Sequence, residues 1–550
     1  MVSLVKKRFH GRAYYYATTM ARVDGKPRRV RQVYLGTAEA ITEKLQHAAR
    51  PARVSLRTFP FGRPAAILRA DHDLTFSKTL DRLVPRRSRR GATVGESLLM
   101  QIAGRDLHLH SRRAIARAHN RSVLAVLFPS ADFSDETLRQ HMDAITPDVQ
   151  RQVEDAVFRR LLDLGIQPSL LLWDTTNVFT RIEAGDDLPR KGMSKEKRND
   201  RNLVGVGLAV SEENIPLLHE TFPGNASDTK VFSKLIDQLA TRLEGLGLDP
   251  KSLVAVFDKG NNSQENIDAL VRRLHLVGTL KRSQAKALLK VPLASFRESF
   301  ITPRGHTIRA YRTRAEFYGR EWTIVVSYNR LTARKQRKKF DQDVRKIKGG
   351  LTDLEERLLK PRGRGRPRTT RGVYQEAFDL IPKKLRAVFH LKVTRPRGRA
   401  RIEWSVKKEE VALRRAAFGK QVIFTDCGDW ETERIVRANH ARTLVEDDFH
   451  FLKDKLLVPI KPIHVRKDER IRAHVFLCVM GVVFWRYLLW RLKEDGRGVT
   501  PTELFDRLAG VRIALVKAEG KARGAFQMEE LDEGSRRLFE GLELRQFVPN

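Results

Sequence analysis

The sequence predicts a mixed α/β fold on the basis of three observations. After Pro168, short apolar runs follow one another, which is typical of strands. Between these runs lie stretches in which an apolar residue recurs every fourth position, as in a helix that packs on a sheet. The chain has 550 residues, which is enough for three or four domains with buried cores. Together these observations exclude a small scaffold held by disulfides.

The N-terminal third is predicted to contain a β-hairpin followed by helices. In residues 8–36, two runs rich in aromatic and β-branched residues flank the turn sequence Asp24-Gly25-Lys26-Pro27. From residue 93 to about residue 162 the pattern is helical, and Ser134 and Thr146 are placed to cap two helices. This region is either a helix-turn-helix that binds DNA or a plain helical linker, because helix spacing alone does not identify a groove reader.

The central part of the chain is predicted to form a sheet. The elements follow in the order strand, strand, strand, helix, strand, helix, strand, with three antiparallel strands first. This order is compatible with a ribonuclease H-like core. The predicted strands cover 169–173, 203–210, 215–222, 252–257 and 276–280, and the predicted helices cover 227–244 and 263–273.

The pattern changes again between residues 286 and 420, where we expect a β-rich insertion domain. Four strand-like pieces surround a highly charged helical stretch at 332–359. The segment 360–368 is too rich in Gly, Pro and Arg to pack and is expected to be a basic loop. The strand-like pieces are 307–311, 322–328, 388–393 and 401–406.

Apolar order returns with a predicted strand at 421–426, a long helical region at 431–457 and an apolar helix at 473–492. Six segments are therefore expected, two of which together form the sheet core. They are a basic hairpin region at 1–50, a helical DNA-binding region at 51–165, a sheet core at 166–285 and 421–495, an insertion at 286–420, and a C-terminal helical region at 496–550 that is a candidate for dimerisation.

The charge balance indicates a polyanionic partner. Lys and Arg number 105 against 66 Asp and Glu, a net charge of +39, and such an excess favours nucleic acid. Attraction to an anionic membrane is the competing explanation, but no basic amphipathic anchor stands out. No secretory signal is visible, and the most apolar segment, 473–485, is shorter than the roughly 20 residues of a membrane span. The two cysteines, Cys427 and Cys478, lack metal-ligand spacing and fit a reducing cytosol.

Two carboxylates stand at the ends of predicted strands. Asp174 follows Leu171-Leu172-Trp173, and Asp258 follows Val254-Ala255-Val256-Phe257. Side chains at carboxyl ends of strands face the crevice where ligands bind in open α/β sheets. If the strands are neighbours, both carboxylates reach one divalent cation, and oxygen donors of this kind suit Mg²⁺ or Mn²⁺. The alternative is that each Asp caps the next helix or turn.

A third carboxylate, Glu446, lies in a predicted helix. At about 100° per residue, it shares one face with Asn439, Arg442, Phe449 and Lys453. A carboxylate with cations before and after it on the same face suits metal binding beside phosphate. The alternative is an ordinary ion pair between Arg442 and Glu446 on a solvated helix.

Seven motifs in order along the chain make the sequence recognisable: Val5-Lys6-Lys7-Arg8, Trp173-Asp174-Thr175-Thr176, Gly192-Met193-Ser194-Lys195-Glu196-Lys197-Arg198, Phe222-Pro223-Gly224-Asn225-Ala226-Ser227-Asp228-Thr229, Phe257-Asp258-Lys259-Gly260, Val445-Glu446-Asp447-Asp448-Phe449 and Asp468-Glu469-Arg470-Ile471-Arg472-Ala473-His474. With them the chain resembles the DDE transposases of bacterial insertion sequences. It resembles the cut-and-paste branch, whose ribonuclease H-like domain is interrupted by a β-rich insertion before the third acid.

The resemblance implies that Asp174, Asp258 and Glu446 are the catalytic acids and hold two Mg²⁺ ions, for which Mn²⁺ substitutes. The branch has a Tyr-x2-Arg-x3-Glu-x6-Lys signature, in which Arg442, Glu446 and Lys453 match and Asn439 stands in place of the Tyr. It implies that Arg442 and Lys453 hold DNA-end phosphates, with Asn439 and Lys259 as further DNA-binding candidates.

The same comparison implies that the insertion domain helps to bind or distort the transposon end. Trp322 is a candidate for stacking on a flipped base there, and a buried strand tryptophan is the alternative. The tetrapeptide Arg364-Gly365-Arg366-Pro367 resembles an AT-hook, in which Arg364 and Arg366 enter the minor groove of A·T-rich DNA. Its alternative is a solvated linker attracted to phosphate.

The expected function is therefore a transposase that cuts DNA at insertion-sequence ends and joins them to target DNA through metal-assisted phosphoryl transfer. The expected partners are double-stranded DNA, as terminal inverted repeats and as target, and a second copy of the chain in a synaptic dimer. The expected location is the bacterial cytoplasm, at the nucleoid. Two alternatives stay open, namely a catalytically silent DNA-binding protein derived from a transposase and a ribonuclease H-like DNA nuclease.

Overall fold

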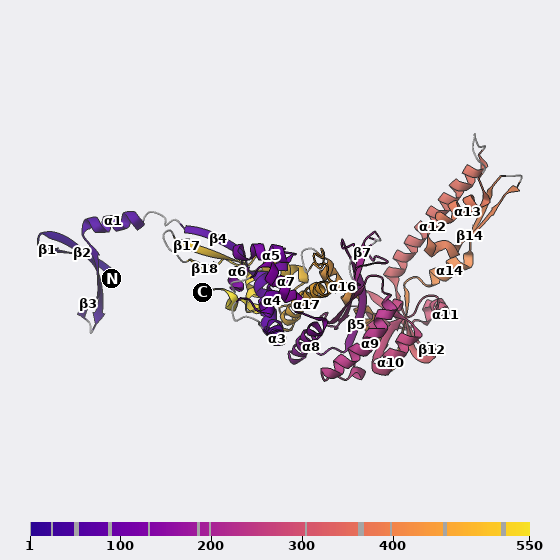
Figure 1. The fold of residues 1–550 in the computed structure, drawn as a ribbon, viewed down its shortest axis with the longest axis horizontal. Helices are drawn as coiled ribbons and strands as arrows, with labels where there is room; N and C mark the ends of the chain where they lie inside the picture. Colours follow the sequence, from indigo (N-terminus) through magenta and orange to yellow (C-terminus); the bar gives the residue numbers. More distant parts are fainter. Residues whose placement is uncertain are drawn as a thin grey trace.

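The computed structural model describes residues 2–23, 26–48, 54–85, 91–129, 133–183, 187–196, 198, 200–302, 305–360, 368–396, 399–454, 459–518 and 524–549. The fold is mixed α/β, as the sequence predicts. Figure 1 shows a central body built on one large sheet, with a helical part on one side of it and a long helix projecting from the other.

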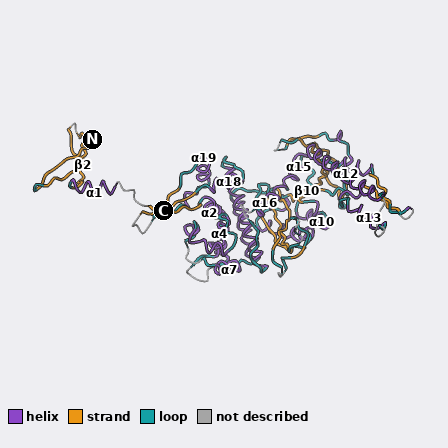
Figure 2. Tube along the Cα trace, turned by 90° about the horizontal axis from the view of Figure 1, so that it is seen from above, coloured by secondary structure: helices purple, strands orange, loops and turns teal. Residues whose placement is uncertain are grey.

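The N-terminal residues form a separate antiparallel sheet of three strands, β1 (Val2–Phe9), β2 (Arg12–Val23) and β3 (Lys26–Gly36), followed by α1 (Ala38–Ala48). The predicted hairpin is confirmed as β2 and β3, and β1 adds a strand that the sequence analysis did not include. In Figures 1 and 2 this sheet lies apart from the rest of the chain.

The central sheet has ten strands in the order β11-β12-β13-β16-β10-β9-β5-β7-β6, with β8 also paired to β7. The β5–β9 and β9–β10 pairs are parallel, and every other pair that joins described residues of this sheet is antiparallel. The strands are β5 (Leu170–Thr180), β6 (Arg190–Lys191), β7 (Asn202–Val210), β8 (Pro216–Pro223), β9 (Val254–Phe257), β10 (His275–Thr279), β11 (Glu298–Ile301), β12 (Thr307–Phe317), β13 (Arg320–Asn329) and β16 (Lys420–Thr425).

Several helices pack against the central sheet, and in the sequence they lie between or after its strands. They are α9 (Asp228–Gly245), α10 (Gln264–Arg273), α11 (Lys286–Lys290), α15 (Thr432–Ala441) and α16 (Thr443–Lys453). Ser263 caps α10 through its side chain, as predicted. The helical region predicted as continuous from 431 to 457 is divided, because the chain turns at Arg442 between α15 and α16.

A helical part surrounds α17 (Asp468–Glu494), the helix that the apolar run predicts. Ser134 and Thr146 accept hydrogen bonds from Thr137 N and Val149 N, so both predicted caps are confirmed. The surrounding helices are α2 (Gly62–Leu74), α3 (Phe76–Leu83), α4 (Val94–Arg105), α5 (Arg112–Ala118), α6 (Leu124–Leu127), α7 (Asp135–Asp143) and α8 (Pro147–Asp163). By length and composition α17 is apolar enough to cross a membrane, but 83% of its most apolar window is buried in the structure, as in a core helix.

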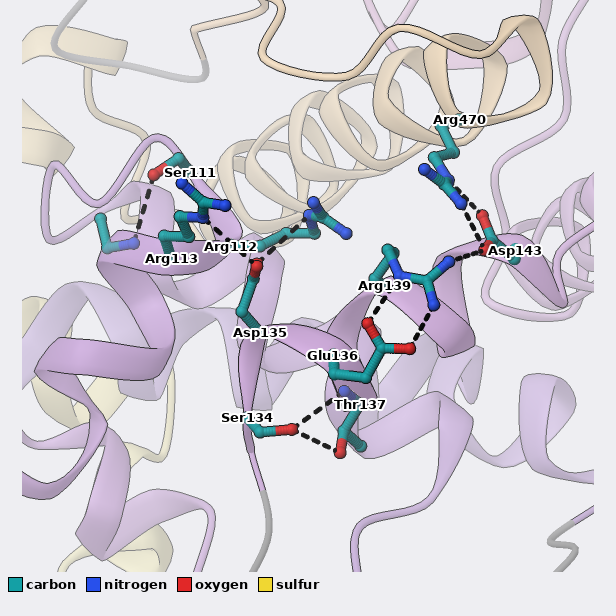
Figure 3. A network of polar contacts seen from close by, with 11 residues as sticks. Ser111, Arg112, Arg113, Ser134, Asp135, Glu136, Thr137, Arg139, Asp143 and Arg470 are labelled. Carbon is teal, nitrogen blue, oxygen red and sulfur yellow. Dashed lines mark hydrogen bonds and ion pairs between the residues drawn. The ribbon is translucent and has the colours of Figure 1, made fainter.

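Polar contacts tie the helical part to the start of α17 (Figure 3). The guanidinium of Arg470 donates to both oxygens of Asp143, at 2.5 and 2.8 Å, and Arg139 reaches the same carboxylate at 3.0 Å. Hydrogen bonds from Arg470 hold the pKa of Asp143 below its usual value. Bidentate arginine–carboxylate contacts fix geometry as well as adding energy, so they set how α7 lies against α17.

The C-terminal region corrects the prediction of helix throughout 51–165 and 496–550. Strand β4 (Val54–Pro60) pairs with β17 (Arg512–Ala518), which also pairs with β18 (Ala525–Met528). Helices α18 (Pro501–Ala509) and α19 (Glu533–Gly541) pack against each other, and α18 also packs against α2. The local sequence pattern did not predict these strands, because β4 and β17 pair across most of the length of the chain and β18 is only four residues long.

The segment 286–420 is divided between two bodies. Strands β11, β12 and β13 extend the central sheet. Described residues between 330 and 419 form a second apolar core, which includes Phe340, Ile347 and Leu351. This second body, called the α12 arm below, contains α12 (Arg330–Leu359), α13 (Thr370–Asp379), β14 (Phe389–Thr394), β15 (Arg401–Val406) and α14 (Lys408–Ala416). Apart from its one hairpin, its described elements are helical, because the expected strands at 307–328 belong to the central sheet.

A buried ion pair fixes α16 against α17. Arg486 Nε donates to Asp448 Oδ1 at 2.6 Å, and the side chains are 7% and 0% exposed. With its amide oriented to satisfy both atoms, Asn214 donates to Asp448 and accepts from Arg486. Burial raises the pKa of Asp448, and the Arg486 cation opposes this shift. Asp448 is thus held in one orientation.

Replacing Arg486 with Met should destabilise the protein by about 3–5 kcal/mol, because it leaves the Asp448 carboxylate buried without its cation. Urea denaturation followed by circular dichroism measures this loss. The matched control is Arg151→Met, which breaks an exposed pair with Asp148 and should cost about 1 kcal/mol or less. Equal losses in the two variants would show that the buried pair does not hold α16.

Candidate active site

One arginine contacts all three carboxylates that the sequence singles out. Arg442 Nη1 lies 3.7 Å from Asp174 Oδ2 and 3.3 Å from Glu446 Oε1, and its Nη2 lies 3.9 Å from Asp258 Oδ1. These acids come from β5, from the end of β9 and from α16. Since each carboxylate is within 4 Å of one guanidinium, the fold brings the three acids together.

Strand register places the first two acids side by side. Strands β5 and β9 pair in parallel, and Trp173 lies opposite Phe257. Asp174 and Asp258 are the next residues on their chains, so they leave the paired region at the same level. This confirms that the two strands are neighbours. The sequence analysis ends the first strand before Asp174, but β5 continues to Thr180, with Asp174 paired to Leu208 of β7.

Asp174 is the most enclosed of the three acids, with its side chain 19% exposed. Its Oδ1 accepts a hydrogen bond from Thr175 N at 2.8 Å. Burial raises its pKa, and the neighbouring Asp258 raises it further, whereas Lys195, the Thr175 amide and Arg442 lower it. Nearby positive charge therefore offsets part of the cost of burying this carboxylate.

Asp258 and Glu446 also make the local contacts expected of a capping residue and of an ordinary ion pair, which are the alternatives to metal binding. Asp258 caps the short 3-10 helix Lys259–Asn261 by accepting from Gly260 N at 3.4 Å. Glu446 pairs with Arg442 one helical turn earlier, and its side chain is 54% exposed. A cap and an ion pair alone would not gather acids from three elements, so the convergence on Arg442 is the informative feature.

Three lysines lie next to this cluster and add positive charge. Lys453 Nζ donates to Thr176 Oγ1 at 2.6 Å and pairs with Glu196 at 3.6 Å, and Lys461 pairs with the same Glu196 at 2.7 Å. Lys195 Nζ donates to the Thr175 carbonyl oxygen at 2.5 Å. Burial lowers the pKa of Lys453. Of these three lysines, only Lys453 is a predicted DNA contact, although Lys195 lies within one of the motifs that carry the resemblance.

The remaining predicted residues lie elsewhere. Asn439 is 4% exposed and its Oδ1 accepts from the Thr279 hydroxyl at 2.8 Å, so this side chain faces the interior. Lys259 is exposed and lines a polar pocket of about 300 Å³ together with Asp258 and Arg442. Arg364 and Arg366 lie outside the described residues, so the AT-hook stays a prediction.

Trp322 is a buried strand tryptophan, which was the alternative to a residue that stacks on a flipped base. Its side chain is 2% exposed and meets the Phe424 ring edge to face at 5.2 Å between centroids. Its indole N–H donates to the Phe317 carbonyl at 2.7 Å. A base would have to displace this packing in order to reach the ring.

A second group of potential ligands lies at the N-terminal end of β10, away from the acids around Arg442. His275, Asp426 and Cys427 are the group within the described chain whose ligand atoms all lie within 4.8 Å of one another. Asp426 already accepts from Leu276 N and contacts His275 Nδ1, both at 2.8 Å. Burial raises the pKa of the Cys427 thiol to about 11. These donors are used within the protein, which favours a structural role. Sequence reasoning missed the group because His275 lies 151 positions before Asp426 and its neighbour Cys427.

The acids around Arg442 fit a divalent ion better. They are three carboxylates, the oxygen donors that Mg²⁺ and Mn²⁺ prefer, and they already face one cation. Asp174, Asp258 and Glu446 would hold the ions, while Arg442 and the neighbouring lysines would face the phosphate groups that such ions accompany.

Comparison with models of known protein families gives no match, and the curated proteins give none either.

Asp174→Asn should weaken Mn²⁺ binding by about tenfold or more, since even residues behind metal ligands contribute 10–100-fold. The electron paramagnetic resonance signal of free Mn²⁺ measures the binding. Asp447→Asn, one residue from Glu446 and exposed, is the control and should bind as the unmodified protein does. Unchanged binding by Asp174→Asn would remove it from the ligand set.

Proposed function

We propose that the protein is a DDE transposase, which cuts DNA at insertion-sequence ends and joins the ends to target DNA with Mg²⁺ or Mn²⁺. The observation that carries this proposal is the meeting of Asp174, Asp258 and Glu446 around Arg442. The sequence resemblance selects the same three acids.

The sheet supports a ribonuclease H-like core. Strands β5, β7 and β8 are consecutive and antiparallel, and β9 and β10 lie parallel to β5 on its other side. This agrees with the strand order that the proposal requires. The α12 arm lies between β10 and α16 in the sequence, as an insertion before the third acid would.

The chain's own residues suit phosphoryl transfer on DNA. Metal ions at the acids would activate a water, and later a DNA 3′-hydroxyl, for attack on a phosphodiester. Arg442 lies where it can exchange its carboxylate contacts for a phosphate oxygen, and a guanidinium binds phosphate with two donors. Lys453 and Lys461 would add positive charge beside the DNA strand whose phosphate Arg442 binds. Thr176 and Glu196 hold these lysines in place.

The proposed partners follow from the same reasoning. Double-stranded DNA offsets the net charge of +39, and the reaction uses terminal inverted repeats and target DNA. We include a homodimer that brings two ends together, a cytoplasmic location at the bacterial nucleoid and a DNA-binding role for the helical part around α17. The resemblance supports the homodimer and the location, whereas the helical pattern and the basic charge of the chain support the DNA-binding role.

A labelled duplex that carries the element boundary tests the proposal. With Mg²⁺ or Mn²⁺ the protein should nick the boundary and join the ends, and EDTA should abolish both reactions. Glu446→Gln should reduce cutting by at least 10³-fold and leave DNA binding nearly intact. Asp447→Asn on the same helix is the matched control and should cut normally.

Other outcomes select the alternatives. Binding without cutting under either metal would favour a silent DNA-binding protein. Cutting without joining would favour a DNA nuclease. Equal loss of binding and cutting in Glu446→Gln would mean that Glu446 acts as a structural ion pair.

Lys453→Gln should weaken duplex binding about equally for all sequences and reduce the salt dependence of log Kd by about one unit per tenfold change in salt, because it removes one phosphate contact. Fluorescence anisotropy at salt concentrations from about 50 to about 300 mM measures both the affinity and the slope. An unchanged slope would place Lys453 away from DNA.

A further inference from the structure

The α12 arm carries an unusual share of the positive charge. Residues 330–419 contain 28 Lys and Arg against 10 Asp and Glu, a net +18 of the +39 of the whole chain. These 90 residues are one sixth of the sequence and hold almost half of its charge excess. Such a local excess of positive charge either binds an anionic partner or destabilises the arm through repulsion between its own cations.

Within the arm, the charge gathers on the first part of α12. Residues 330–348 hold nine Lys and Arg and two acids, whereas residues 349–359 hold one Arg and three acids. All nine cations are exposed. The opposite face of the helix is buried in the arm's own core through Ala333, Phe340 and Ile347. The helix is thus amphipathic, with an apolar face inside the arm and a cationic face on the surface.

Six of the nine cations form one stripe, called the α12 basic stripe. At about 100° per residue they fall within an arc of about 100° on the helix surface. Asp341 lies in the same arc and pairs with Arg415 of α14 at 3.0 Å. Among the described residues, no ion pair is formed by the stripe. Its members are Arg330, Arg334, Arg337, Lys338, Arg345 and Lys348.

The length of the stripe matches a duplex. Eighteen residue steps of about 1.5 Å give about 27 Å along the helix axis, and DNA rises about 3.4 Å per base pair. The stripe therefore spans about eight base pairs. A rigid helix with cations on one face suits phosphate contacts that do not depend on sequence.

The basic part of α12 is also the part near the acids. Thr332 and Gln336, in its first two turns, line the same pocket of about 300 Å³ as Asp258 and Arg442. Figure 1 shows α12 leaving the central body from this end and projecting outwards. DNA held at the acids would therefore pass close to the start of α12.

We infer that the α12 basic stripe is a docking surface for the phosphate backbone of duplex DNA beside the cleavage site. The stripe holds about eight base pairs without reading their sequence. This inference rests on the proposed function for its location relative to the cut, but its test requires neither metal nor cutting.

The test compares two triple variants in which the same charge is lost. Arg334→Gln, Arg337→Gln and Lys348→Gln remove half of the stripe, and Gln is a good helix former. The control replaces three exposed cations of the C-terminal region, Lys493, Arg536 and Arg537, with Gln. Binding of a random-sequence 20-base-pair duplex is measured by anisotropy in EDTA at several salt concentrations. Circular dichroism checks that both variants fold.

The stripe variant should bind at least tenfold more weakly at moderate salt, and its slope of log Kd against log salt should fall by about 2.7, that is about 0.9 per lost contact. The control should keep the slope within about one unit. Equal slopes in the two variants, with the unmodified protein binding normally, would overturn the inference and leave the proposed function standing. Tighter binding of duplex RNA than of DNA would overturn the identity of the partner. No duplex binding by the unmodified protein would remove the proposed function itself.

Discussion

The buried pair of Asp448 and Arg486 is the contact on which the candidate site depends. An ionised carboxylate inside a protein is costly unless its cation stays in place, so any other rotation of α16 would leave Asp448 buried without a partner. Glu446 is two residues earlier, about 200° around the helix. Fixing Asp448 towards α17 therefore points Glu446 towards Asp174 and Asp258. A buried interaction that is not itself reactive thus orients a residue that is.

Helix α17 also joins the helical part to the sheet through the motif at its start. Asp468 accepts from Asp187 N and Leu188 N at 2.7 and 3.0 Å, Arg470 holds Asp143, and Arg472 donates to the Thr221 carbonyl of β8 at 2.5 Å. These contacts reach a loop, a helix and a strand. The motif that supports the sequence resemblance therefore has a structural task, which is to position the parts that flank the acids.

Charge is arranged in two ways in this protein. Around Arg442, acids and cations are interleaved at short range, so their fields largely cancel until a ligand with its own charge arrives. Along α12 the cations stand together, and Asp341, the acid in the same arc, pairs with Arg415 of α14 instead. The fields of the cations therefore add over tens of ångströms at low salt. The first arrangement suits chemistry at one phosphate, and the second suits the holding of many phosphates.

The sequence by itself determined the local features of this protein. The helix caps at Ser134, Thr146 and Ser263 are confirmed, as are the principal strands of the central sheet, because each depends on a few neighbouring residues. The choice of Asp174, Asp258 and Glu446 also came from sequence, through strand ends and a helical face. The extent of β5 was wrong, since polar residues such as Asp174 are tolerated within a strand whose other positions are buried.

Only the tertiary structure decided what depends on distant partners. Strand β4 finds β17 at the other end of the chain, β11–β13 join the central sheet instead of a separate domain, and Arg442 meets acids from three elements. Asn439 and Trp322 are buried although their residue types suit DNA contact. The physical reason is that backbone propensity and capping act over a few residues, whereas strand pairing, burial and charge clustering are set by which segments pack together.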